Sequence, residues 1–228
     1  MKKIEIIPAV LPKDYFELEE KVETIKGFTK RMQVDICDGQ FVLSATWPYK
    51  KEDDTFEKLQ KEEVGLPGWE TIDYEFDLMV NRPEDIVESW IIAGANRLII
   101  HVEAKGDIKS ALEEINGAVE VGLAINIDTD ISALEPYKDD ISFVQCMGID
   151  QIGFQGQSFD DQVLKKIKAV KKAYPNLAIS VDGGVSMDNA LSLIKAGADR
   201  LVIGSAIFGS NNPIDTLQTF KKLQGEIL

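Results

Sequence analysis

Apolar strand segments alternate regularly with amphipathic helical segments through almost the whole chain of 228 residues. Eight segments have the short apolar runs of buried parallel strands, and a helical segment follows each of them. The expected strands cover residues 4–8, 31–35, 71–78, 97–101, 120–127, 141–147, 178–182 and 200–203. Strict alternation requires parallel strands joined by helices. Eight units favour a closed barrel over an open sheet, so we predict a single TIM-barrel, (β/α)8, domain over residues 1–228.

The last two strands both run into glycine turns. The turns consist of Gly183 and Gly184 after the seventh strand and of Gly204 and Ser205 after the eighth. Glycine lets the backbone turn tightly and brings N–H groups close to a ligand. In eight-unit barrels these two loops commonly bind phosphate. The pattern therefore indicates a phosphate site, although ordinary turn chemistry would account for the glycines equally well.

Net charge and cysteine content exclude several classes of protein. The formal net charge is −14, which disfavours nucleic acid and anionic membrane surfaces as partners because both require a basic face. Two cysteines, Cys37 and Cys146, provide no disulfide framework and fit a reducing cytosol. The opening run contains Glu5 and Pro8 and is expected to be a strand and not a signal peptide. We expect a cytoplasmic protein without a membrane span.

Three carboxylates stand at the ends of expected strands, where the active site of such a barrel lies. Asp35, Asp77 and Asp182 should therefore converge on one barrel mouth, and Gln33 points to the same face of its strand as Asp35. With a cation they would form an oxygen-rich site; without one, at least one should keep its proton. Two facing carboxylates also suit proton removal and return on opposite faces of a carbon. Each aspartate alone could be a helix cap or a loop residue, but this explanation is much less favoured for all three together.

Six motifs in these segments occur in the order found in one enzyme family. They are Asp-Ile-Cys-Asp-Gly-Gln-Phe-Val at 35–42, Asp-Leu-Met-Val at 77–80, His-Val-Glu-Ala at 101–104, Gly-Phe-Gln-Gly-Gln-Ser-Phe at 153–159, Val-Asp-Gly-Gly-Val at 181–185 and Gly-Ser-Ala-Ile-Phe at 204–208. Through them nearly the whole chain resembles the ribulose-phosphate 3-epimerase family. The resemblance implies a ribulose-phosphate-binding barrel and an isomerase of the pentose phosphate pathway. Such an enzyme inverts the carbon beside the keto group of a pentulose 5-phosphate.

The resemblance also implies roles for particular residues. Asp35 and Asp182 match the two carboxylates that exchange protons with the substrate through an enediolate, and both also bind a divalent metal in the family. The implied substrate contacts are Gly156, Gly183, Gly184, Gly204 and Ser205 for the phosphate, and Met79 and Met147 beside the enediolate. Core filling would explain the two methionines as well. His101 is a candidate donor to a substrate hydroxyl, although a lone histidine at a strand end is as often structural. Family members assemble as oligomers, so a homo-oligomer is expected.

Several positions depart from the family pattern. Gln33 and Asp77 stand where the family has two metal-binding histidines, and His101 is the only histidine of the chain. An amide and a carboxylate in place of two imidazoles make an all-oxygen site, which shifts the expected metal from zinc or iron toward magnesium, manganese or calcium. Gln155 replaces a glycine of the phosphate loop, and Ala9 replaces a serine.

Three functions are consistent with these departures. The first is epimerisation of a pentulose 5-phosphate at an altered metal site. The second is a barrel with a decayed metal site that only binds a phosphosugar, and the third is an epimerase or lyase acting on another sugar phosphate. The irregular segment 40–70, with Trp47 and Trp69, is either a lid over the site or a packing surface.

Overall fold

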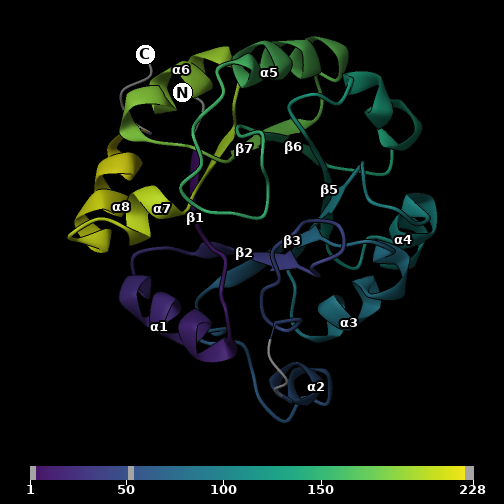
Figure 1. The fold of residues 1–228 in the computed structure, drawn as a ribbon, viewed down its shortest axis with the longest axis vertical. Coiled ribbons are helices and arrows are strands. Elements are labelled where there is room, and N and C mark those ends of the chain that lie inside the picture. Colours follow the sequence, from purple (N-terminus) through teal and green to yellow (C-terminus); the bar gives the residue numbers. More distant parts are fainter. Residues whose placement is uncertain (1–3, 51–53, 224–228) are drawn as a thin grey trace.

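Eight parallel strands close into one barrel in their sequence order (Figure 1). The computed structural model describes residues 4–50 and 54–223. The strands are β1 (Glu5–Val10), β2 (Arg31–Cys37), β3 (Asp73–Met79), β4 (Arg97–His101), β5 (Glu120–Ile125), β6 (Phe143–Met147), β7 (Ala178–Asp182) and β8 (Arg200–Ile203). The predicted (β/α)8 fold is confirmed.

Helices surround the barrel and connect its strands (Figure 1). They are α1 (Tyr15–Ile25), α2 (Thr55–Gln60), η1 (Pro83–Asp85), α3 (Val87–Ile92), α4 (Ile108–Ile115), η2 (Ile131–Tyr137), α5 (Gln162–Ala173), α6 (Met187–Ala196), α7 (Ser205–Phe208) and α8 (Pro213–Lys222). Across the described ranges 4–50 and 54–223, none of these helices combines the length and the apolar character that crossing a bilayer requires.

Two connections differ from the expected helices. Pro83 predicts the start of one helix that runs to Ala93, because proline is tolerated in the first turn of a helix. The structure instead has the 3₁₀ turn η1 and the α-helix α3, which begins after Ile86 at φ −131°. That φ lies far from the helical value and interrupts the helix. The glycine turn expected after β8 leads directly into α7, a four-residue helix that the sequence pattern did not indicate.

Apolar side chains fill two separate spaces. The larger cluster lies between the outer face of the strands and the helices, and Phe76 and Trp90 are among its fully buried members. A second cluster fills the barrel interior with side chains from every second residue of the strands. Cys37, Met79 and Met147, at the carboxyl ends of β2, β3 and β6, belong to it. The strands are thus covered on both sides, as parallel strands require.

The lower end of the barrel interior is closed by charged and aromatic side chains. Arg97 pairs with Glu75 and, at 2.8 Å, with Glu120. The Phe143 ring lies between Arg97 and Arg200, whose guanidinium carbons are 5.2 and 4.6 Å from its centre. These pairs neutralise buried charge. The opposite, carboxyl end of the strands remains available for a site.

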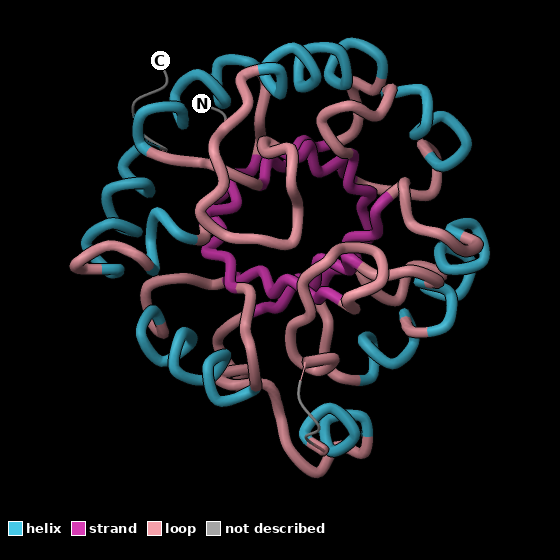
Figure 2. Tube along the Cα trace, in the orientation of Figure 1, coloured by secondary structure: helices cyan, strands magenta, loops and turns pink. Residues whose placement is uncertain are grey.

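The segment 40–70 serves mainly for packing. Trp47 is 1% exposed, and its ring centre is 5.4 Å from that of Tyr15 and 5.8 Å from that of Trp90. Trp69, in contrast, is 65% exposed. The first residues of the segment and the loop after β6 pass over the barrel opening (Figure 2), and Ser44 Oγ donates a 2.5 Å hydrogen bond to the Gly153 carbonyl between them. Only this first part of the segment reaches the mouth.

Candidate active site

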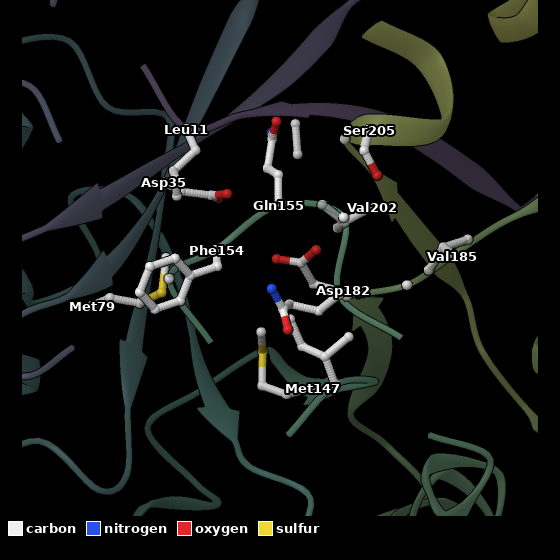
Figure 3. A pocket seen from close by; sticks show the side chains of 18 residues that line it. Leu11, Asp35, Met79, Met147, Phe154, Gln155, Asp182, Val185, Val202 and Ser205 are labelled. Carbon is white, nitrogen blue, oxygen red and sulfur yellow. The ribbon is translucent and has the colours of Figure 1, made fainter. Parts of the chain in front are cut away.

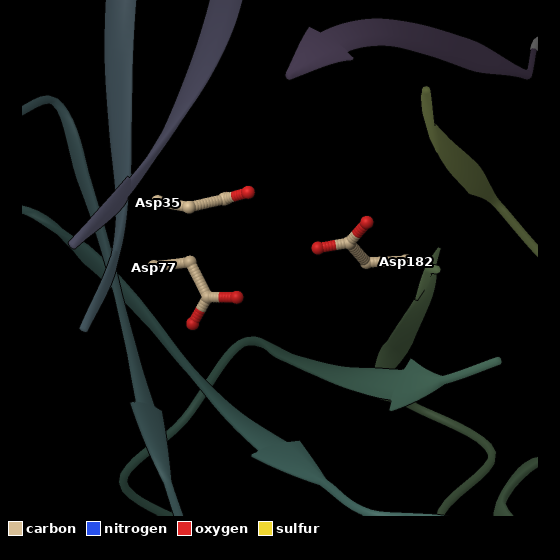
Figure 4. Close-up of side chains that lie close together, drawn as sticks. All are labelled: Asp35, Asp77 and Asp182. Carbon is tan, nitrogen blue, oxygen red and sulfur yellow. The ribbon is translucent and has the colours of Figure 1, made fainter. Parts of the chain in front are cut away.

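Three aspartates meet at the carboxyl end of the barrel (Figure 4). Asp35 and Asp77 are register partners on β2 and β3, and Asp182 ends β7 on the other side of the interior. One oxygen of each carboxylate lies within 4.8 Å of the others. The convergence expected from the strand ends is therefore present. It arises because every inward-facing residue at a strand's end points to the same axis.

Gln33 joins two of these carboxylates from below. Its Nε2 donates 2.8 Å hydrogen bonds to Asp35 Oδ1 and to Asp182 Oδ2. Its Oε1 is buried and, within the described part of the chain, finds no hydrogen-bond partner. Rotation of the amide by half a turn would exchange the two atoms and direct the oxygen at the carboxylates. Three carboxylates and an unsatisfied amide oxygen fit a divalent cation that prefers oxygen ligands.

Burial and mutual repulsion raise the pKa values of Asp35 and Asp182. Burial and the charges of Asp182 and Asp77 raise the pKa of Asp35 well above its usual value. Burial and the charge of Asp77 raise the pKa of Asp182 from 3.8 to about 7. Like charges in one site cannot all ionise at neutral pH. In the cation-free site one carboxyl can therefore donate a proton while another accepts one.

Asp77 is fixed from two sides by neighbouring strands. His101 Nε2 lies 3.0 Å from its Oδ1, and Gln145 Nε2 donates a 3.0 Å hydrogen bond to its Oδ2. Burial works against a charged imidazole, but the hydrogen bond to Asp77 and the charges of Asp77 and Glu103 outweigh it and raise the pKa of His101 to about 9. His101 is thus a cation at neutral pH and partly offsets the negative charge of the three aspartates.

A cavity opens beside the aspartates (Figure 3). The twelve predicted site residues divide into two groups by their relation to it. The residues that line it are Asp35, Asp182, Met79, Met147, Gly156, Gly183, Gly184, Gly204 and Ser205, and Gln155 joins them. Gln33, Asp77 and His101 are not among the described residues that line the cavity. The cavity therefore brings carboxylates, sulfurs and glycine turns together.

His101 differs most from its expected position. We expected it to reach a substrate hydroxyl, but its side chain is 0% exposed and lies behind Asp77. The loop after β2 covers it, with the Phe41 ring centre 5.2 Å from the imidazole centre. A strand-end position in the sequence cannot reveal that a loop from a distant part of the chain folds over it.

Glycine is required at the turn after β7. Gly183 and Gly184 have φ values of +99° and +66°, and a Cβ on them would lie 2.7 Å from Ile149 Cγ1 and 2.8 Å from Phe159 Cα. Other residues would strain the backbone and collide with these neighbours. The turn thus brings backbone close to the cavity wall, where N–H groups can meet an anion.

Apolar lining residues were missed by the sequence analysis. Leu11, Ile149, Val185 and Val202 form walls of the cavity. Nothing in the sequence marks them, because an apolar residue beside a strand end has the same pattern as one in the core.

Comparison with known proteins connects this site to one family. The model of the family described as "Ribulose-phosphate 3 epimerase family" matches residues 5–208. Ribulose-phosphate 3-epimerase of Bacillus subtilis (strain 168) is 31% identical over 217 residues, which cover 92% of this chain and 94% of that protein. The enzyme of the same name from Aquifex aeolicus (strain VF5) is 28% identical over 213 residues, or 91% and 90% of the two chains.

Solved structures resemble this chain in fold. 3-Hexulose-6-phosphate synthase from Salmonella typhimurium superposes with a TM-score of 0.73 at 13% identity, covering 98% of this chain and 99% of the other. 3-Keto-L-gulonate-6-phosphate decarboxylase from Vibrio cholerae O1 biovar El Tor gives 0.71 at 10% identity, with 97% and 98% covered. At such identities the likeness shows the barrel fold alone.

Proposed function

The chain belongs to the ribulose-phosphate 3-epimerase family, and on this premise we propose that it inverts carbon 3 of a pentulose 5-phosphate, interconverting ribulose 5-phosphate and xylulose 5-phosphate. One observation carries the proposal. Asp35 and Asp182 extend from opposite walls of the barrel toward a common space (Figure 4). Inversion needs a base on one face of the carbon and an acid on the other, and two opposed carboxylates provide both.

The proton transfers balance within this pair. One carboxylate takes the proton from carbon 3, the C–H electron pair forms a double bond to carbon 2, and the carbonyl oxygen takes the negative charge. The other carboxyl then delivers its proton to the opposite face of carbon 3, and the carbonyl bond forms again. The raised pKa values of Asp35 and Asp182 support this exchange because they allow one protonated and one ionised carboxyl near neutral pH.

The glycine turns are the proposed phosphate site. Backbone N–H groups around Gly156, Gly183, Gly184, Gly204 and Ser205 line the cavity on the side of β7 and β8. A net charge of −14 repels an anionic substrate at long range. Local N–H donors are therefore the groups suited to hold the phosphate. Met79 and Met147 provide apolar walls beside the reacting carbon.

We place a divalent cation among Asp35, Asp77 and Asp182, with the amide oxygen of Gln33 as a fourth ligand. The buried, unpartnered Oε1 of Gln33 supports this placement. The all-oxygen set favours magnesium or manganese over zinc or iron. When bound, the cation would supply Lewis-acid stabilisation of the negative charge that develops on the substrate oxygens.

A second candidate function is binding of a sugar phosphate without turnover. It is favoured by the two hydrogen bonds that Gln33 Nε2 donates to Asp35 and Asp182. These bonds partly satisfy both carboxylates in the absence of a cation. In that case the glycine turns would retain their role while the aspartates would have none.

Proton exchange on the substrate distinguishes the two functions. The protein is incubated with ribulose 5-phosphate in heavy water, with chelator and separately with magnesium or manganese, and NMR follows deuterium at carbon 3 and the appearance of xylulose 5-phosphate. Metal-dependent exchange with inversion is the expected result. Asp182→Asn should abolish exchange and keep phosphosugar affinity. Binding without exchange under any metal would refute the epimerase proposal.

A further inference from the structure

His101 is a buried imidazole that the proposed chemistry leaves unused. Its side chain is 0% exposed, and its ring contacts Phe41 on one face. Its Nε2 lies 3.0 Å from Asp77 Oδ1, and its Nδ1 lies 3.7 Å from Glu103 Oε2. The ring therefore stands between two carboxylates and connects the loop after β4 with the cluster of aspartates.

This connection has a fixed outer end. The Asn126 backbone N–H donates a 2.8 Å hydrogen bond to Glu103 Oε1, which anchors Glu103 to the end of β5. From that anchor, Glu103 and Asp77 orient the imidazole from both sides. The imidazole in turn occupies one lone pair of Asp77 Oδ1.

Asp77 keeps a free coordination direction in spite of its two hydrogen bonds. Each carboxylate oxygen has two lone pairs, and His101 and Gln145 use one on each. One oxygen of Asp35, one of Asp77 and one of Asp182 lie within 4.8 Å of one another, so the remaining lone pairs of Asp77 are available to a shared cation. Without the two donors, the carboxylate could rotate about its Cβ–Cγ bond and lose this alignment.

We propose that His101 is a positioning residue for the cation site: its Nε2–H bond holds the Asp77 carboxylate in the orientation that a divalent cation requires. The inference rests on the proposed function, because it assumes that a cation binds among the three aspartates. It assigns the sole histidine of the chain to the residues that hydrogen-bond to metal ligands and orient them. Removing such a residue typically lowers metal affinity 10- to 100-fold.

A matched pair of variants tests the hydrogen bond. In His101→Gln the longer amide side chain can place its nitrogen near the position of Nε2, whereas in His101→Asn the shorter amide reaches only the position of Nδ1. Both are polar, uncharged and smaller than histidine. The probe is Mn²⁺ alone, and the free ion is counted by electron paramagnetic resonance during titration. His101→Asn should bind Mn²⁺ about 10- to 100-fold more weakly, and His101→Gln should stay near the wild-type affinity.

One control and one further variant complete the test. Affinity for inorganic phosphate should be unchanged in both variants, because the glycine turns lie on other strands. Mn²⁺ affinity of His101→Asn equal to that of the wild type would overturn the inference. An equal loss in both variants would also overturn it, since damage to packing would then be the cause. If His101→Asn does not fold, Glu103→Ala, which removes the acceptor facing Nδ1, should weaken Mn²⁺ binding, and unchanged binding would refute the role.

The outcomes separate this inference from the proposed function. If the wild type exchanges the carbon 3 proton while His101→Asn keeps full Mn²⁺ affinity, the epimerase proposal stands and the positioning role fails. If the wild type neither binds Mn²⁺ nor exchanges the proton, both fail together.

Discussion

Replacing Asp182 by asparagine should stabilise the cation-free protein while abolishing catalysis. The pKa of Asp182 is raised from 3.8 to about 7, first by burial and then by the charge of Asp77. Between these two values the folded protein holds a proton that the unfolded chain has released. The folded state is therefore favoured at acid pH and loses this advantage as the pH rises through about 7. At 1.36 kcal/mol per pKa unit, the loss above pH 7 is about 4 kcal/mol.

Asparagine removes this pH-dependent cost and preserves the local hydrogen bond. Its side-chain oxygen can accept from Gln33 Nε2, as Asp182 Oδ2 does at 2.8 Å. Urea denaturation in chelator at pH 5 and pH 8 measures the effect. The wild type should lose several kcal/mol of unfolding free energy between the two values relative to the variant. Carboxylates remote from the site contribute equally to both proteins and cancel in the difference. The pKa of Asp35 falls in the variant, because the charge of Asp182 helps to raise it, and this change adds to the difference.

Saturating Mg²⁺ or Mn²⁺ provides an internal control. A bound cation neutralises the repulsion, so it should restore the stability of the wild type at pH 8 and have little effect on Asp182→Asn. Identical pH dependence of stability in the two proteins would show that Asp182 does not carry the raised pKa. The argument from burial and like charge would then be refuted.

Two substitutions and an elemental analysis give three separate tests. Gly184→Ala places a Cβ 2.8 Å from Phe159 Cα at φ +66°, at a strain cost of about 1–3 kcal/mol. Because the turn must shift, KM for the phosphorylated substrate should rise about tenfold or more. An unchanged KM in steady-state kinetics would contradict a phosphate role for this turn. Gly122→Ala places a Cβ 2.5 Å from the Phe143 ring at the barrel floor; urea denaturation should show a loss of about 1–3 kcal/mol, with catalysis retained in the folded fraction. Elemental analysis of protein purified without chelator should find magnesium or manganese, and stoichiometric zinc would contradict the all-oxygen site.

The barrel could be predicted because its signals are local. Each strand is a short apolar run covered on both faces, and each helix has one apolar stripe, so the alternation is visible without any tertiary information. Parallel strands place their carboxyl ends at one mouth, which is why Asp35, Asp77 and Asp182 could be grouped from strand ends alone. Their catalytic and metal-binding roles remain predictions.

Tertiary structure decided which of these residues meet the cavity and which support it. The side chain of Asp182 lines the cavity, whereas His101, also at a strand end, is buried because Phe41 folds over it from the loop after β2. The amide of Gln33 bridges Asp35, which is two positions away in the sequence, and Asp182, which is 149 positions away. Such relations depend on barrel closure and on loop paths. Contacts between distant segments carry no periodic signal, so the sequence determined the elements and their order, and only the closed barrel determined how deep each side chain lies.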